Sequence, residues 1–290
     1  MTELRKKGRP RGRAGDSGDS GGIRALDRAL DILDAIAAGN GLTLTEIGQR
    51  LQMAPSTVHR VLVTLAARGV AEQDASSQAW HVGPTAFRHG SAFMRRSGLV
   101  ERARPVLRRL METTGETANL GILNGDAVLF LSQAETHETI RAFFPPGTRS
   151  PLHASGIGKA LLAHARPQEL RAMIRGLRLE RFTPHTLSEP EQLAEDLVRI
   201  RARGYSLDNE ERTLGMRCIA APIFDLAREA AAGISVSGPV HRMSDDRLAE
   251  TVDSLARARF PAVQADLARH PGVPQGWTVR VIGAIEALDL

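Results

Sequence analysis

Three amphipathic helices are predicted between residues 23 and 69, because apolar side chains recur there three or four positions apart. The first helix stops at a Gly-Asn-Gly run at 39–41, and the second is short, with Thr43 or Thr45 as its cap. The third begins at Pro55, which suits a first helical turn, and ends at Gly69. The apolar positions of the three helices are Ile23, Leu26, Leu30, Leu33, Ile36, Leu44, Ile47, Leu51, Val58, Val61, Leu62 and Leu65.

The pattern then changes from helical spacing to short strand-like segments. Residues 70–73 and 79–82 flank a polar turn at 74–78, which predicts a hairpin. Three helices followed by a hairpin, with a tight turn at 52–54, are typical of a winged helix-turn-helix. The outer face of the third helix is then a candidate DNA-reading surface, and the alternative is an ordinary solvated helix face. Its candidate residues are Ser56, Thr57, His59, Arg60 and Thr64.

The rest of the chain alternates between strand and helix patterns. Residues 84–115 are expected to be helical, with a break at Ser97-Gly98. Strands are expected at 118–123, 128–132, 139–144, 205–209, 217–224 and 232–237, and helices at 156–164, 167–174, 189–203 and 245–269. The predicted fold class is α+β, with an antiparallel sheet flanked by helices after the winged helix-turn-helix.

These patterns suggest five segments. Residues 1–22 are expected to be a disordered basic tail, 23–83 a DNA-binding domain and 84–98 a linker helix. Residues 99–270 are expected to bind an effector and to oligomerise, and 271–290 to form a C-terminal extension.

Charge draws attention to the tail. The formal net charge is +5, and residues 1–13 hold six basic residues against one acid, a surplus equal to that of the whole chain. The run Lys7-Gly8-Arg9-Pro10 resembles an AT-hook, in which arginines such as Arg9, Arg11 and Arg13 would enter the narrow minor groove of A·T-rich DNA. The alternative is a generic basic arm that binds phosphates without sequence preference.

Several other classes of protein are disfavoured. A single cysteine, Cys218, excludes an intramolecular disulfide framework and a multi-cysteine zinc site. The histidines lack metal-ligand spacing, and no cofactor motif is found, so neither metal nor cofactor is expected. No apolar run is long enough for a membrane span, and a cytoplasmic location is expected.

At this point a resemblance to a known family is evident. Residues 23–83 resemble the DNA-binding half of the IclR family of bacterial regulators, above all in the run from Pro55 to Leu65. A second match lies near the C-terminus, where the spacing of the family signature is kept throughout. The residues of this chain that match the signature are Gly204, Asp208, Glu211, Cys218, Ile219, Ala220, Ile223, Phe224 and Asp225. The resemblance spans about residues 23–269 and implies a GAF-like effector domain.

The residues in this domain are consistent with a small-anion site. Gly156 and Ile157 open a predicted helix, so their free amides and the helix dipole would favour a carboxylate. The period of a strand places Ser235 and Ser237 on one face, where their hydroxyls can donate to the same group. Asp208 and Cys218 complete the set that the resemblance assigns to small 2-oxo acids such as glyoxylate or pyruvate.

The sequence therefore predicts a transcriptional regulator that is not an enzyme. It is expected to bind a palindromic or pseudo-palindromic operator as a homodimer or tetramer, with glyoxylate as the first choice of effector. Pyruvate or an aromatic compound is the alternative effector, and activation and repression stay open. The rival functions are an enzyme acting on a 2-oxo acid, with Cys218 as nucleophile and His153 as its base, and an architectural DNA-binding protein.

Overall fold

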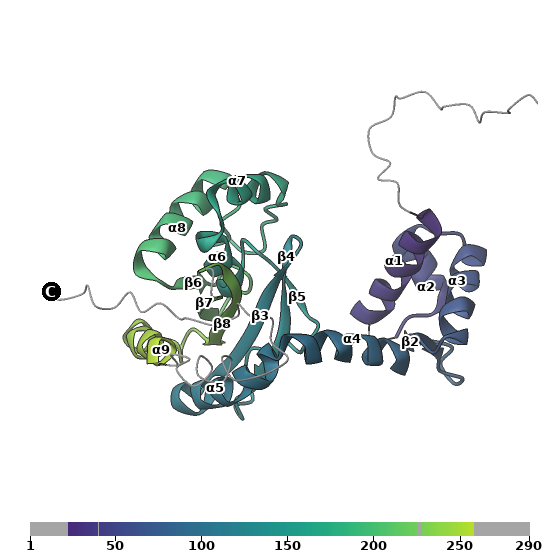
Figure 1. Cartoon of the computed structure of the whole chain (residues 1–290), viewed down its shortest axis with the longest axis horizontal. Helices are drawn as coiled ribbons and strands as arrows, with labels where there is room; N and C mark the ends of the chain where they lie inside the picture. The colour runs from purple at the N-terminus through teal and green to yellow at the C-terminus, as the bar shows by residue number, and fades with distance from the viewer. Residues whose placement is uncertain (1–22, 40, 226–227, 258–290) are drawn as a thin grey trace, which may run out of the picture. The chain divides into compact units, whose positions relative to one another are not determined.

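The structure is a computed structural model, and it describes residues 23–39, 41–225 and 228–257 (Figure 1). The chain divides into two compact units, residues 1–93 and 94–290.

The N-terminal unit contains three helices and a hairpin, as predicted. The elements are α1 (Arg24–Ala38), α2 (Leu44–Leu51), α3 (Pro55–Ala67), β1 (Ala71–Gln73) and β2 (Trp80–Val82). Thr43 caps α2 through a reciprocal capping box with Glu46, and Pro55 lies in the first turn of α3. β1 and β2 pair antiparallel, so the helices and the hairpin form the expected winged helix-turn-helix.

The core of this unit uses only part of the apolar surface of α1. Ile32, Ala35 and Ile36 are buried, together with apolar side chains of α2, α3 and β2. By contrast, Ile23, Leu26 and Leu30 are 69%, 54% and 51% exposed. The helical spacing predicted an amphipathic helix correctly, but the first half of its apolar stripe lies outside the core because only the second half packs against the other helices.

The C-terminal unit is built on a six-stranded sheet in the order β5-β4-β3-β8-β7-β6, with every neighbouring pair antiparallel. The strands are β3 (Thr117–Asn124), β4 (Ala127–Ala134), β5 (Arg149–Pro151), β6 (Ser206–Asn209), β7 (Met216–Phe224) and β8 (Ala230–Pro239). The helices after the hairpin are α4 (Pro84–Ser97), α5 (Leu99–Thr114), α6 (Gly156–His164), α7 (Pro167–Gly176), α8 (Pro190–Arg203) and α9 (Asp245–Arg257). Gly98, in the left-handed conformation, separates α4 from α5 at the predicted break.

Helices cover both faces of this sheet (Figure 1). On one face, side chains such as Leu120, Ile219 and Val236 form a core with α5 and α9. On the other face, Phe130 and Ala220 pack with residues of α6 and α8. The alternation of side chains along each strand therefore sends one apolar set to each helical layer. The second layer, α6 with α8, lies over the polar residues discussed below.

One predicted strand is wrong. Residues 139–144 form no strand, and β5, which was not predicted, pairs with β4 instead. Phe144 stacks on Phe130 with ring centroids 4.8 Å apart, and the carbonyl of Ala142 accepts a 3.4 Å hydrogen bond from the side chain of Gln133. Phe144 thus packs against the sheet without joining it, and Phe143 is exposed, while the edge of β4 is occupied by β5. The helix predicted to reach residue 269 is described as far as Arg257, and the remainder lies outside the described residues.

Candidate effector site and DNA-binding surface

Four neighbouring strands place two rows of small, mostly polar side chains across one face of the sheet. Residues that lie directly opposite each other in antiparallel strands point to the same side. Across β3, β8, β7 and β6, the first row is Asn119, Ser235, Ala220 and Ser206. The second row, in the same strand order, is Thr117, Ser237, Cys218 and Asp208. Four of the predicted effector residues are thereby brought together from segments far apart in the sequence. They are Asp208, Cys218, Ser235 and Ser237.

The first turn of α6 lies directly against these rows. A Cβ atom added to Gly156 would be 2.7 Å from the Cys218 sulfur and 3.2 Å from the Ala220 Cβ, so only glycine allows this approach. Ser155 caps α6, and its hydroxyl accepts a 3.3 Å hydrogen bond from the amide of Gly158. Ile157, the second residue of α6, buries its side chain in the core. The start of the helix is therefore fixed with its first amides near the serines and the thiol.

The thiol of Cys218 is neutral in this setting. Loss of solvation raises its pKa to about 11, and the charge of Asp208 acts in the same direction. Hydrogen bonds from Ser237, Ser235 and the amide of Gly156 oppose this rise. His153, the base considered for an enzyme, is buried and bonds the Glu180 carbonyl through Nε2 at 2.9 Å. A neutral thiol and an engaged histidine do not form a nucleophile and base pair.

Asn119 lies in the same rows of side chains, although it was not among the predicted residues. Its side chain is fully buried, and Nδ2 lies 3.4 Å from the hydroxyl oxygens of both Ser235 and Ser237. Asn119 is the one polar side chain in the predicted strand 118–123. A polar residue within an otherwise apolar strand was the signal that could have identified it.

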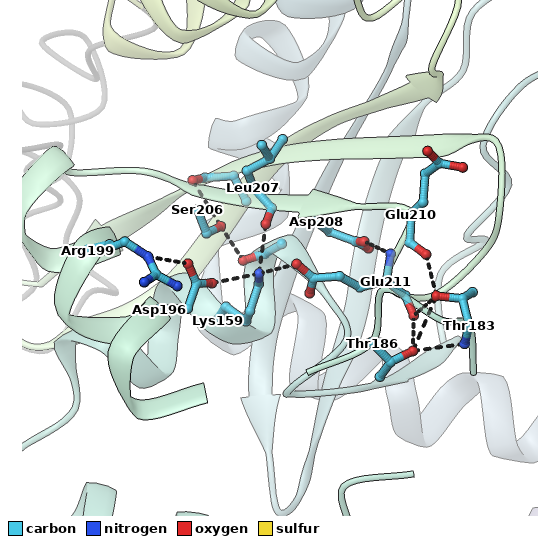
Figure 2. Close-up of polar contacts among 12 residues, drawn as sticks. Lys159, Thr183, Thr186, Asp196, Arg199, Ser206, Leu207, Asp208, Glu210 and Glu211 are labelled. Carbon is cyan, nitrogen blue, oxygen red and sulfur yellow. Dashed lines mark hydrogen bonds and ion pairs between the residues drawn. The ribbon is translucent and has the colours of Figure 1, made fainter. Parts of the chain in front are cut away.

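A buried cluster of charges surrounds Lys159, one turn into α6 (Figure 2). Its side chain is wholly buried, and Nζ donates to Asp196 Oδ2 at 2.8 Å, to Glu211 Oε1 at 2.6 Å and to the Leu207 carbonyl at 2.7 Å. The ammonium has three N–H donors, and each has an acceptor within the protein. Lys159 is therefore a structural cation, and its ammonium has no free donor with which to bind an anion.

This cluster holds Asp208 in place. The Glu211 amide donates to Asp208 Oδ1 at 2.8 Å, and Thr183 and Thr186 donate to the Glu210 and Glu211 carbonyls at 2.7 and 2.6 Å (Figure 2). Burial raises the pKa of Asp208 to about 6 against the opposing influence of Lys159. Burial likewise raises the pKa of Glu211 to about 7. The carboxyl directly opposite Cys218 on the neighbouring strand is thus a weaker acid than a solvated aspartate.

The DNA-reading candidates lie on the outer side of α3. Ser56, His59, Arg60 and Thr64 are exposed, and Thr57 is half-buried. The hydroxyl of Thr64 donates to the Arg60 carbonyl of its own helix at 2.8 Å.

A groove of about 370 Å³ separates the candidate helix α3 from α1. It is lined by Thr57, Arg60 and Thr64 of α3 and by Arg28 of α1, among others. Arg28 is a second cation beside Arg60. It was not among the predicted DNA-reading residues, because those were taken from the outer face of the third helix alone. Arg9, Arg11 and Arg13 lie outside the described residues.

Two other kinds of feature, a metal site and a membrane-spanning helix, are absent from the described part of the chain. There, no group of three or more His, Cys, Asp or Glu side chains is arranged to hold a metal ion. Over the same residues, no helix has the length and apolar character needed to cross a membrane.

Comparison with known proteins identifies both units. Residues 25–75 match the family model described as IclR helix-turn-helix domain. Residues 91–259, more than half of the chain, match the model described as Bacterial transcriptional regulator IclR C-terminal.

Two relatives and one solved structure agree with these matches. The chain is 81% identical to the HTH-type transcriptional regulator BhcR of Paracoccus denitrificans over 258 residues, 88% of this chain and 92% of that protein. It is 40% identical to the transcriptional repressor IclR of Escherichia coli over 234 residues, 80% and 85% of the two chains. An IclR homologue of Microbacterium hydrocarbonoxydans, solved with 4-hydroxybenzoate, superposes with a TM-score of 0.68 at 26% identity, covering 81% of this chain and 95% of that one. The chain therefore belongs to the IclR family, and it is a DNA-binding transcriptional regulator rather than an enzyme.

Proposed function

We propose that this regulator changes its affinity for an operator when a small carboxylate binds between the start of α6 and the polar rows of the sheet. The effector-binding residues are Gly156, Ile157, Asp208, Cys218, Ser235 and Ser237. The observation that carries the proposal is a gathering of neutral donors there: the start of α6 lies directly against the Cys218 sulfur, and Ser235 and Ser237 lie on the neighbouring strand, on the same face of the sheet. Neutral donors at a helix N-terminus favour an anion without needing a cation.

The size and polarity of the side chains favour a small effector. Serine, cysteine and aspartate present short polar groups, whereas an aromatic effector would be better matched by a more apolar lining. Glyoxylate is the first choice, and pyruvate is the alternative of similar size. The 4-hydroxybenzoate bound by the Microbacterium homologue is an aromatic carboxylate. It supports the carboxylate class and keeps an aromatic acid as the second alternative.

For DNA binding, we propose that residues 23–83 form the DNA-binding domain and that α4 links it to the effector domain. Ser56, Thr57, His59, Arg60 and Thr64 would face the major groove, and Arg28 supports a phosphate contact beside Arg60.

We also propose that the chain works as a homo-oligomer, a dimer or a tetramer, on a palindromic or pseudo-palindromic operator. The exposed apolar side chains Ile23, Leu26 and Leu30 support association through α1. An effector would alter operator affinity by favouring one arrangement of the subunits over another.

The test is a fluorescence-polarisation titration on DNA from the region upstream of the chain's own gene, with and without glyoxylate. Wild-type protein should change its operator affinity with glyoxylate, and Ser235→Ala should weaken that response. Ser254→Ala is the matched control, because among the described residues that hydroxyl bonds the Glu250 carbonyl of its own helix and lies on a different element from the candidate site. If DNA binds but neither glyoxylate, pyruvate nor an aromatic acid alters the affinity, the carboxylate-effector proposal is wrong.

A further inference from the structure

The carboxamide of Asn119 carries a hydrogen-bond acceptor that the protein leaves unused. Nδ2 faces the hydroxyl oxygens of Ser235 and Ser237, while Oδ1 is buried and has no partner among the described residues. Buried polar atoms are nearly always hydrogen-bonded in native proteins, so an unused one at a binding site points to a ligand.

The hydrogen bonds of the serines fix which end of the carboxamide is unused. In the proposed effector site Ser235 and Ser237 each donate their single proton to the carboxylate, and Nδ2 of Asn119 lies 3.4 Å from both hydroxyl oxygens. They can therefore only accept from Asn119, so its NH₂ group must face them. Oδ1 is then the buried end of the carboxamide without a partner among the described residues, and it can do nothing but accept.

We propose that Asn119 selects, among small carboxylates, those that also carry a hydroxyl on the carbon next to the carboxylate. Its Oδ1 accepts a hydrogen bond from that hydroxyl. This inference rests on the proposed effector site. The ligand class is a 2-hydroxy acid or the hydrate of an aldehyde acid, in which the carbonyl carbon carries two hydroxyls. Hydrated glyoxylate belongs to this class.

The chemistry of the acceptor explains the selection. An ionised carboxylate and a ketone oxygen have no proton to donate, so either one facing Oδ1 would place two acceptors together. A plain acid such as acetate would leave Oδ1 desolvated and unpaired, which costs binding free energy. Thr117 on the same strand also has a buried hydroxyl with no partner among the described residues. That hydroxyl can rotate to donate or to accept, so it cannot discriminate in the same way.

The experiment is isothermal titration calorimetry of the full chain with glycolate and acetate, which differ by one hydroxyl, and then with glyoxylate and pyruvate. Wild-type protein should bind glycolate at least about tenfold more tightly than acetate, because one buried hydrogen bond is made or lost. Asn119→Leu, of similar size, should bring the ratio close to one by weakening glycolate alone. Asn124→Leu, the same change at the exposed end of β3, should keep the wild-type ratio.

Three other outcomes would overturn the proposal, and they differ in what they leave standing. Equal binding of glycolate and acetate by wild-type protein overturns the role of Asn119 while the proposed effector class stands. Equal weakening of both acids in Asn119→Leu also overturns it, because the residue then only supports the site. If wild-type protein binds no small acid, the proposed function fails and the selection with it. Thermal unfolding verifies that Asn119→Leu is folded, and Asn119→Ala replaces it if not.

Discussion

At the scale of single residues, we expect the loss of Lys159 to destabilise the protein most. Its ammonium is fully buried between Asp196 and Glu211, at 2.8 and 2.6 Å. Lys159→Met keeps the length of the side chain but leaves two carboxylates without their buried cation. We expect a loss of about 3–5 kcal/mol in the free energy of unfolding, measured in urea.

An exposed ion pair provides the control for Lys159. Arg149 pairs with Asp126 at 2.8 Å, but both side chains are more than half exposed. Arg149→Met should therefore cost less than about 1 kcal/mol. Equal losses in the two variants would contradict the structural role given to Lys159.

Asp208 should make stability depend on pH. Burial raises its pKa from 3.8 to about 6, and that of its neighbour Glu211 from 4.5 to about 7. A carboxyl with a raised pKa binds its proton more tightly in the folded state, so its contribution to stability is greatest at acidic pH and falls as the pH rises from about 4 to 7.

Asp208→Asn removes one of these two titrations and keeps an oxygen that can accept from the Glu211 amide. The variant should gain stability relative to wild type as the pH rises, by up to about 3 kcal/mol between pH 4 and 7. The comparison is made by urea unfolding across this range. The cations near the group, Lys159 and Arg212, are the same in both proteins. Glu211 loses the nearby charge that raises its pKa, so its change acts in the same direction as the loss of the Asp208 titration. A difference that stays flat, or falls with pH, would refute the assignment.

At this scale, the residues that could be predicted were those whose partners lie close to them in the sequence. Ser235 and Ser237 could be placed on one face because a single strand fixes their alternation. Lys159 meets Asp196 and Asn119 meets Ser235 only after folding, at separations of 37 and 116 residues. No local pattern encodes those pairs, and only the unusual residue types in apolar surroundings point to them.

At the scale of elements, helices and strands with strong local signals were predicted well. The start and end of α6, the capping of α2 and the break at Gly98 each follow from residues within a few positions. Residues 139–144 were misassigned because pairing with β4 depends on which segment reaches its edge. That edge belongs to β5, which begins only after the proline pair at 145–146.

The close approach of α6 to the sheet gives a prediction about packing. In Gly156→Ala the new methyl group would lie 2.7 Å from the Cys218 sulfur, so the start of α6 or β7 must move. We expect a loss of about 1–3 kcal/mol in the free energy of unfolding. Gly176→Ala at the end of α7 meets nothing within 4 Å, and its stability should be unchanged or slightly raised. If both variants keep wild-type stability in urea, α6 is not packed as tightly as described.

At the scale of the whole molecule, the positive charge is concentrated where the chain begins. Residues 1–13 carry six cations and one acid, and the rest of the sequence is close to neutral. Operator binding by such a chain combines sequence reading by α3 with attraction of the tail to phosphates. The salt dependence of binding can separate these two contributions, because each phosphate contact releases counterions.

Deleting residues 1–22 should lower operator affinity and make it less sensitive to salt. The plot of log affinity against log salt concentration should become shallower by up to about 5, if each of the six cations contacts one phosphate. Polarisation titrations of the full and shortened chains on one operator, flanked by either A·T-rich or G·C-rich DNA, measure this directly. A larger loss on the A·T-rich flanks assigns Arg9, Arg11 and Arg13 to the minor groove, as in an AT-hook, whereas equal losses assign them to phosphates alone. An unchanged salt dependence would mean that the tail does not contact DNA, and the charge surplus would then need another partner.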